Sequence, residues 1–138
     1  MRVRSHERRG TAATEFALLL PILLSVLIGV VDGGLAMSKQ HMLARAARDG
    51  ARIGSMTIEP IPATGELIEL AAEEAALRSL TAAGLTSGVF VTADWDVDES
   101  GLAWVTVVVS AEHRSILGPM SPLHGTHARS FTMLTQEQ

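Results

Sequence analysis

The sequence predicts an α+β protein attached to a membrane, with a long N-terminal transmembrane helix, a second helix, and a small antiparallel β-sheet of about three strands. Three observations lead to this prediction. Residues 16–31 contain no charge, the segments that follow repeat apolar residues at helical spacing, and the last third of the chain alternates with a period of two. A chain of 138 residues has the size of one small domain with a membrane segment.

The apolar run is long enough to cross a bilayer. Between residues 11 and 31 the only charged side chain is Glu15, and a bilayer core needs about 20 apolar residues in a helix. We therefore expect residues 11–31 to form a transmembrane helix. Pro21 should bend this helix because it removes one backbone hydrogen bond, which membrane helices tolerate.

The helical pattern continues past the membrane, so residues 32–56 should form an extracytoplasmic continuation of the first helix. One face is made of residues spaced four, three and four apart, namely Leu43, Ala47, Gly50 and Gly54. A basic stripe lies roughly opposite, namely His41, Arg45, Arg48 and Arg52. Small residues let another helix approach closely. This face therefore packs either on a neighbouring subunit or on the chain's own sheet, with the arginines in solvent.

Residues 57–138 should form a small α+β extracytoplasmic domain. Two prolines in "TIEPIPATG" break the first helix, and a second helix is expected at 65–83 with Thr64 as its cap. Its leucines predict an apolar face and its glutamates an acidic face: Leu67, Leu70, Leu77 and Leu80, and Glu66, Glu69 and Glu73. The acidic face either stays in solvent or meets the arginines of the first helix.

Strands are expected at 89–98, 102–111 and 126–134, because apolar and polar residues alternate in the first and valines dominate the second. The sequence Asp98-Glu99-Ser100-Gly101 supplies the turn between the first two strands. The segment 114–125, "RSILGPMSPLHG", contains two prolines and should form a loop.

The composition excludes several kinds of chemistry. The chain has no cysteine, so it has no disulfide, no thiol nucleophile and no thiolate metal site. The net charge is −4, and removal of residues 1–10, which carry Arg2, Arg4, Arg8 and Arg9 against Glu7, would leave an acidic product. This argues against nucleic-acid binding. The sequence contains no nucleophile-elbow motif and no phosphate-binding glycine loop. We therefore expect no enzyme activity and no cofactor.

Two groups of possible metal ligands lack the rest of a motif. One alternates like the first ligands of an EF-hand, namely Asp94, Asp96 and Asp98, but Glu99 replaces the required glycine and Val105 the required glutamate. The other could converge around the proline loop, namely His113, His124 and His127. Without matching carboxylates or a spacing motif, we do not expect a zinc site there.

The arginine-rich start followed by an apolar run has three possible explanations. An ordinary cleaved signal peptide would use Gly34-Leu35-Ala36 as its small-x-small site, although the helical pattern runs through that site. An uncleaved signal anchor would keep the leading arginines in the cytoplasm. Four arginines precede the helix (Arg2, Arg4, Arg8 and Arg9), and three basic residues follow it closely (Lys39, Arg45 and Arg48).

The third explanation accounts for Gly10 and Glu15 together. The segment Gly10-Thr-Ala-Ala-Thr-Glu15-Phe16 resembles the processing site of type IV prepilins. The wider pattern resembles the TadE-like family of pseudopilins, on Arg8-Arg9-Gly10, Glu15-Phe16, Pro21, Asp32-Gly33-Gly34 and "AARDGARIGSM" at 46–56. The resemblance covers residues 8–56 well and the remainder only in its general layout.

The resemblance implies a pilin-like fold and a precursor whose basic leader, residues 1–10, is removed by a prepilin peptidase between Gly10 and Thr11. It implies a minor pilin, pseudopilin or assembly factor of a tight-adherence (Flp-type) pilus. Such a protein spans the bacterial cytoplasmic membrane once, with its N-terminus in the cytoplasm and its C-terminal domain outside, and contacts other pilin or pseudopilin subunits. The alternative is an unprocessed single-pass anchor whose outer domain binds a protein partner.

Glu15, followed by Phe16, would carry the charge used in assembly. A charge at the bilayer centre costs about 2.5–3.5 kcal/mol, and Glu15 near the cytoplasmic edge should cost less. Cleavage would free the amine of Thr11, which could meet Glu15 of a neighbouring subunit. Two unit charges about 4 Å apart attract by roughly 4 kcal/mol at an effective dielectric of 20. Alternatively, Glu15 simply stabilises the helix N-terminus through the helix dipole.

Overall fold

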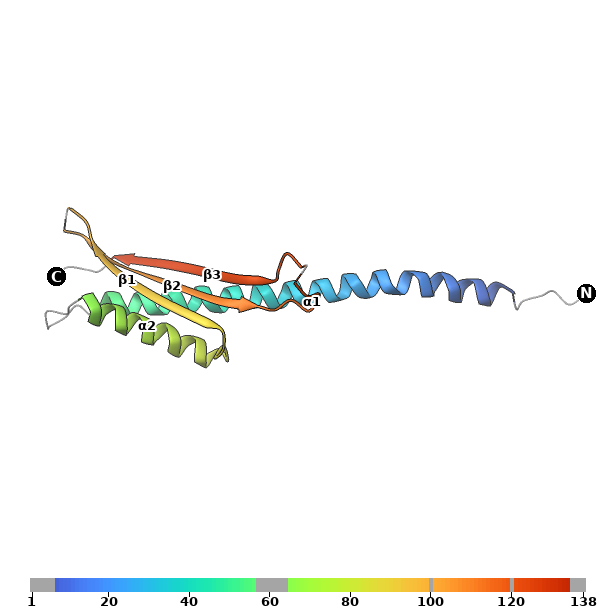
Figure 1. Cartoon of the computed structure of the whole chain (residues 1–138), viewed down its shortest axis with the longest axis horizontal. Coiled ribbons are helices and arrows are strands. Elements are labelled where there is room, and N and C mark those ends of the chain that lie inside the picture. Colours follow the sequence, from blue (N-terminus) through green and yellow to red (C-terminus); the bar gives the residue numbers. More distant parts are fainter. Residues whose placement is uncertain (1–6, 57–64, 100, 120, 135–138) are drawn as a thin grey trace, which may run out of the picture.

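The computed structural model describes residues 7–56, 65–99, 101–119 and 121–134. They form helices α1 (Glu7–Met56) and α2 (Gly65–Ala82), followed by strands β1 (Val89–Val97), β2 (Ala103–His113) and β3 (Gly125–Leu134) (Figure 1). The α+β class and the order of elements predicted from the sequence are confirmed. The predicted helix break at 57–64, with Thr64 as the cap, lies outside the described residues.

Helix α1 has two parts with different surroundings. Its N-terminal part extends away from all other elements, and every residue from 11 to 27 is exposed (Figure 1). Among the described helices, α1 alone is long and apolar enough to cross a membrane. An 18-residue window in it has a mean hydropathy of 2.3, and 6% of that window is buried. This part of α1 is therefore consistent with a single-pass membrane anchor.

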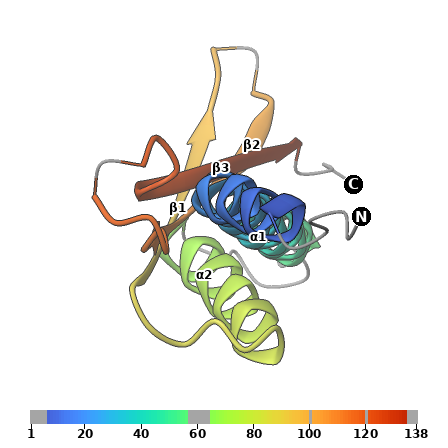
Figure 2. The same ribbon diagram turned by 90° about the vertical axis from the view of Figure 1, so that its right-hand side faces the viewer.

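The three strands form one antiparallel sheet in the order β1-β2-β3. Val107 in the central strand lies opposite Ala93 of β1 and Phe131 of β3. The inner face of β2 is fully buried, namely Val105, Val107, Val109 and Ala111. Figure 2 shows this sheet lying across one side of α1, with α2 alongside. The pairing continues to His113 opposite Gly125, so β2 and β3 reach slightly beyond the ends predicted from the sequence.

The core lies where the C-terminal part of α1 meets α2 and the sheet. Buried side chains come from α1 (Leu43, Ala46, Ala47 and Ala51), from α2 (Ile68, Ala72, Ala76 and Leu80) and from β2. Most of the helical contributors are alanines, and the two helices therefore approach closely. At Gly50, an added Cβ would lie 2.7 Å from the carbonyl oxygen of Ala72.

The predicted apolar face of α2 is wrong. Leu67, Leu70 and Leu77 are 52%, 61% and 47% exposed, and of the predicted face only Leu80 is buried. The buried face consists instead of Ile68, Ala72, Ala75, Ala76 and Leu80. The physical reason is the close contact with α1, because a leucine could not fit against Gly50 and Gly54 at this distance.

Helix α2 also covers the outer edge of the sheet. Strand β1 is an edge strand, and its backbone N–H groups at Ala93 and Trp95 donate to the carboxylates of Glu73 and Glu69, at 3.1 and 3.2 Å. Four residues of helix rise about 6 Å, and two residues of strand rise about 6.6 Å, so the spacings match. These glutamates thus satisfy edge donors that would otherwise be open to another strand.

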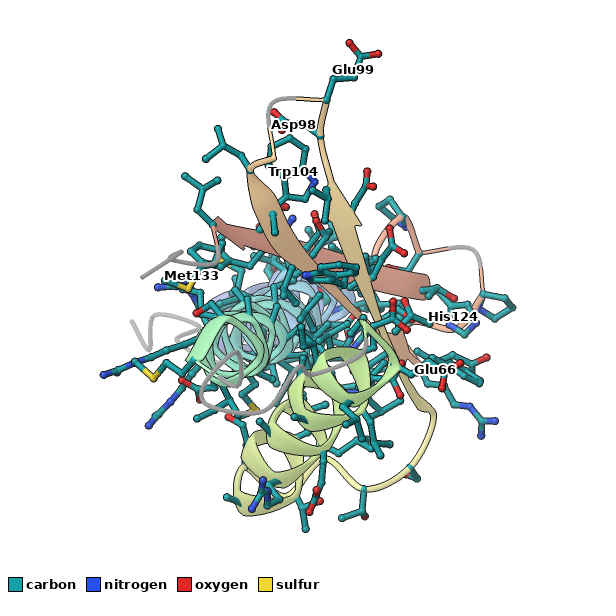
Figure 3. The ribbon with its side chains drawn as sticks, turned by 90° about the vertical axis from the view of Figure 1, so that its left-hand side faces the viewer. Glu66, Asp98, Glu99, Trp104, His124 and Met133 are labelled. Carbon is teal, nitrogen blue, oxygen red and sulfur yellow. The ribbon has the colours of Figure 1, made fainter. Side chains whose placement is uncertain are left out.

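The β1–β2 hairpin projects away from both helices, with Asp98 and Glu99 at its tip (Figure 3). The N–H of Leu102 donates to the carboxylate of Asp98 at 2.8 Å. Gly101 has φ +85°, a conformation that favours glycine. The turn predicted at this sequence is therefore present, and its acidic residues lie at the end of the domain far from the exposed part of α1.

Candidate membrane-anchoring and assembly site

The predicted cleavage site lies near the start of α1. The helix begins at Glu7, so Gly10 and Thr11 are within its first turns, and Thr11 is exposed. The hydroxyl of Thr14 donates to the carbonyl oxygen of Thr11 at 2.8 Å. The remaining leader, residues 1–6, lies outside the described residues.

Glu15 and Phe16 follow one turn later on the same exposed part of α1. Both side chains are exposed, and Phe16 is 59% accessible. Glu15 and Phe16 therefore lie on the part of α1 that no other described element covers (Figure 1).

The small-residue face is in the core of this chain. Leu43 and Ala47 are completely buried. A Cβ added at Gly54 would lie 3.0 Å from Cβ of Ala72 and 3.1 Å from Val105. Of the two alternatives left open by the sequence, this structure uses the face for packing on the chain's own sheet and second helix.

The basic stripe remains on the surface. Arg45 is paired weakly with Asp49 one turn later, at 3.9 Å, and its side chain is 83% exposed. Arg48 donates to the carbonyl oxygen of Ala44 at 3.2 Å and lies over the ring of Phe131, 6.0 Å from its centroid. Arg52 is exposed as well. The stripe thus leaves three guanidinium groups facing away from the core of the subunit.

Asp32 forms a buried site that the sequence did not reveal. It is completely buried, and it is the first residue after the predicted membrane segment. Its carboxylate accepts the hydroxyl of Ser115 at 2.5 Å and the backbone N–H of Ile116 at 3.1 Å. Nε2 of His113, also buried, lies 3.4 Å from the same carboxylate. Only the resemblance, through its Asp-Gly pair, drew attention to this residue, and it gave no partner.

The partners of Asp32 stabilise its charged form. The hydroxyl of Ser115 lowers the pKa of Asp32 most, followed by the N–H of Ile116. Burial opposes this by removing hydration and raises the pKa, while His113 lowers it further. A carboxylate that accepts well-placed donors favours ionisation. Asp32 therefore fastens the β2–β3 connection to α1 as a charged acceptor.

A second set of polar contacts lies beside this site. Gln40 on α1 accepts a hydrogen bond from Arg129 at 2.5 Å and lies 3.4 Å from a ring nitrogen of His127. The ring of His127 lies 5.8 Å from that of His113. These contacts join the third strand to the middle of α1.

The histidines converge around the loop as the sequence suggested, but each has a different neighbour. His124 accepts the N–H of Ser115 at 3.3 Å, and His127 lies 3.1 Å from the carbonyl oxygen of Leu123. In the described part of the chain, no group of three or more His, Asp or Glu side chains is arranged to hold a metal ion. The aspartates at 94, 96 and 98 belong to the hairpin and do not form such a group either.

The residues around Asp32 thus form a junction between the exposed apolar part of α1 and the folded domain. No match was found among curated proteins or among solved structures. Residues 10–52 match the family model described as TadE-like protein, which confirms the resemblance. This stretch runs from the predicted cleavage site through Asp32 to Arg52, so the greater part of α1 is similar to the TadE-like family.

Proposed function

We propose that the protein is a minor pilin, pseudopilin or assembly factor of a tight-adherence (Flp-type) pilus. A prepilin peptidase cuts it between Gly10 and Thr11, and α1 then holds it in the cytoplasmic membrane with its outer domain on the far side. The observation that carries this proposal is the family match, which begins at Gly10 itself and continues through the exposed apolar helix. The proposed role is structural.

The position of Asp32 argues against an ordinary signal peptide. Cleavage after Ala36 would remove Asp32, whose carboxylate holds Ser115 and Ile116. Ala36 itself is 1% exposed, inside the packed part of α1. A mature protein that began at Met37 would lose both contacts, so the folded domain supports a mature chain that keeps the whole membrane helix.

The arrangement of charges supports the proposed assembly role. Glu15 is exposed in the apolar part of α1, where a neighbouring subunit could present the amine of its Thr11. The side chains at Arg45, Arg48 and Arg52 are exposed on the outer part. Since Leu43, Ala47, Gly50 and Gly54 are already used inside the subunit, we assign contacts with other pilin or pseudopilin subunits to exposed residues of this part of α1, the basic stripe among them.

The N-terminus of the membrane-extracted protein tests the proposal. Mass spectrometry should find Thr11 as the first residue in cells that contain a prepilin peptidase. Gly10→Leu should block cleavage and leave the precursor in the membrane, whereas the matched control Gly34→Leu, downstream of the cut, should be processed normally. An intact leader in the unmodified protein would support the unprocessed anchor instead, and a start at Met37 would support a signal peptide.

The role of Glu15 needs a separate measurement. Glu15→Ala should still be cleaved but should enter pilus assemblies poorly, because the amine of Thr11 would lose its proposed partner. Glu15→Asp, which keeps the charge, is the matched control. Normal incorporation of Glu15→Ala would rule out the charge-pairing role, while the proposed cleavage would still stand.

A further inference from the structure

The β2–β3 connection exposes apolar side chains at the end of the domain nearest the membrane helix. Figure 1 shows this connection beside α1, at the point where the exposed part of the helix meets the sheet. Ile116 is 59% exposed and Leu117 is 50% exposed. Single exposed apolar residues are ordinary, but two adjacent ones at this position call for a physical reason.

The connection is fixed at the level where α1 leaves the membrane. At 1.5 Å per residue, residues 11–31 span about 31 Å, close to the roughly 30 Å of a bilayer core. Asp32 comes next, and it accepts the N–H of Ile116 at 3.1 Å. Leu117 in turn donates its N–H to the hydroxyl of Ser115, at 3.1 Å. The two apolar residues are therefore tied to the helix at the outer boundary of the hydrocarbon.

The helix also exposes apolar side chains at this level. Val30, Val31 and Leu35 on α1 are 68%, 49% and 49% exposed, immediately before and after Asp32. If residues up to Val31 are covered by lipid, the same leaflet reaches the level of Ile116 and Leu117. Ile116 and Leu117 thus lie at the level where the lipid-facing surface of the helix ends.

Polar and cationic groups lie next to these two residues. Arg114 is exposed, and together with His113 and His124 it lines a polar pocket of about 240 Å³. Lys39 on α1 donates to the carbonyl oxygen of Glu112 at 3.4 Å. An apolar surface with cationic neighbours matches the boundary between acyl chains and phosphate groups.

We propose that the β2–β3 connection is a second membrane contact, in which Ile116 and Leu117 enter the outer leaflet and Arg114 lies among the lipid phosphates. This inference rests on the proposed placement of α1 in the membrane. With two contacts joined through Asp32, the tilt of the domain relative to the bilayer is restricted more than a single helix would restrict it.

The absence of cysteine from the sequence allows a direct test with single substitutions. The full-length protein carrying Leu117→Cys would be labelled with bimane and reconstituted in vesicles of phosphatidylethanolamine and phosphatidylglycerol. Lipids with a nitroxide near the headgroup or along the acyl chain would then quench the fluorophore. Leu102→Cys is the matched control, because Leu102 is also 50% exposed but follows the hairpin at the opposite end of the domain.

Lipid nitroxides should quench the label at position 117 several-fold more strongly than the label at position 102, and a water-soluble quencher should show the reverse order. Equal quenching at the two positions would overturn the inference. A label at Leu23→Cys separates the two proposals. If position 23 is quenched by lipid and position 117 is not, only the second contact fails; if position 23 is not quenched, the membrane placement of α1 fails with it.

Labelling a second position controls for a local disturbance of the structure by the fluorophore. Ile116→Cys should give the same result as Leu117→Cys. With the label at position 116, Leu117→Glu should reduce lipid quenching several-fold, because a carboxylate resists entry into the leaflet. The signals of the two tryptophans would show whether the domain stays folded. A folded Leu117→Glu variant with unchanged quenching would contradict the proposal.

Discussion

Residues 11–31 and residues 32–56 belong to one continuous helix, yet their side chains have opposite surroundings. In the first part the large apolar residues are exposed, as Leu23 is at 61%. In the second part Leu43 and Ala47 are completely buried, and a Cβ added at Gly50 would meet α2 and β2. The two parts differ in the size of their apolar side chains as well as in their polarity.

This comparison shows how one helix serves two environments. Leucine, isoleucine and valine face outward where lipid is the expected neighbour, since lipid tails accept bulky apolar groups without a specific fit. Alanine and glycine face inward where a second helix must come close. Hydropathy identifies the membrane part of the helix, whereas the small volume of alanine and glycine identifies the face of the second part that packs against α2.

The largest expected effect comes from truncating the same residue type in each part. Leu43→Ala should lower the free energy of unfolding of the outer domain by about 2–5 kcal/mol, because it leaves a cavity in the core. Leu23→Ala should leave that free energy unchanged, since Leu23 contacts no part of the domain. Thermal unfolding in detergent micelles, followed by the near-UV signal of Trp95 and Trp104, measures both. Similar losses for the two variants would contradict the comparison.

A smaller effect is expected from adding one methyl group. Gly50→Ala should destabilise the domain by about 1–3 kcal/mol, because the new Cβ would force α1 and α2 apart. At Gly34 an added Cβ meets nothing within 4 Å, so Gly34→Ala should be neutral or slightly stabilising through its better helix propensity. The same unfolding measurement applies. A stable Gly50→Ala variant would mean that the helices can separate without loss.

The stability of the folded domain should depend on pH through Asp32, which lies at the boundary between the two parts. Its pKa is lowered in the folded state, so its contribution to stability is complete above the usual aspartate pKa of about 3.9 and is lost as pH falls through the folded pKa. Wild type should therefore be more stable than Asp32→Asn at neutral pH, and the two should converge in acid. Unfolding temperatures across this range test the sign. A difference that persists at low pH would show that shape, and not charge, is what Asp32 supplies.

The smallest effect is expected on the solvent-facing surface of the domain. Arg78 and Glu74 on α2 form an ion pair at 3.8 Å, with both side chains about two-thirds exposed. Arg78→Ala should change the unfolding free energy by less than about 0.5 kcal/mol. The Arg78→Lys variant, which keeps the charge, is the control. A loss comparable to that of Gly50→Ala would show that this face of α2 has a partner.

The sequence was sufficient to predict the two helices, the three strands and their order, because each has a clear local period and is bounded by prolines, glycines or acidic turn residues. It also identified Gly10, Glu15 and the basic stripe as features to explain. Each of these predictions depends only on residues close together in the sequence. The start of α2 at Gly65 and the turn at Gly101 also follow from such local patterns.

The faces of α2 and the role of Asp32 could not be predicted in this way. Leucines look more hydrophobic than alanines, so the sequence pointed to the wrong face, whereas burial was decided by the fit against Gly50 and Gly54. Asp32 meets Ser115 across 83 residues, and no local pattern connects them. Likewise, the glutamates at 69 and 73 look like a solvated face until β1 is placed beside them.

In the topology proposed above, the separation of Asp32 from its donors in the sequence also sets an order of events while the domain crosses the membrane. A chain that crosses from its N-terminal side onward brings the carboxylate to the outer surface before Ser115 and Ile116 have crossed. Water must hydrate it during that interval, and the cluster can close only after nearly all of the polypeptide has crossed. A nascent chain stopped short of Ser115 would leave a bare negative charge beside the acyl chains.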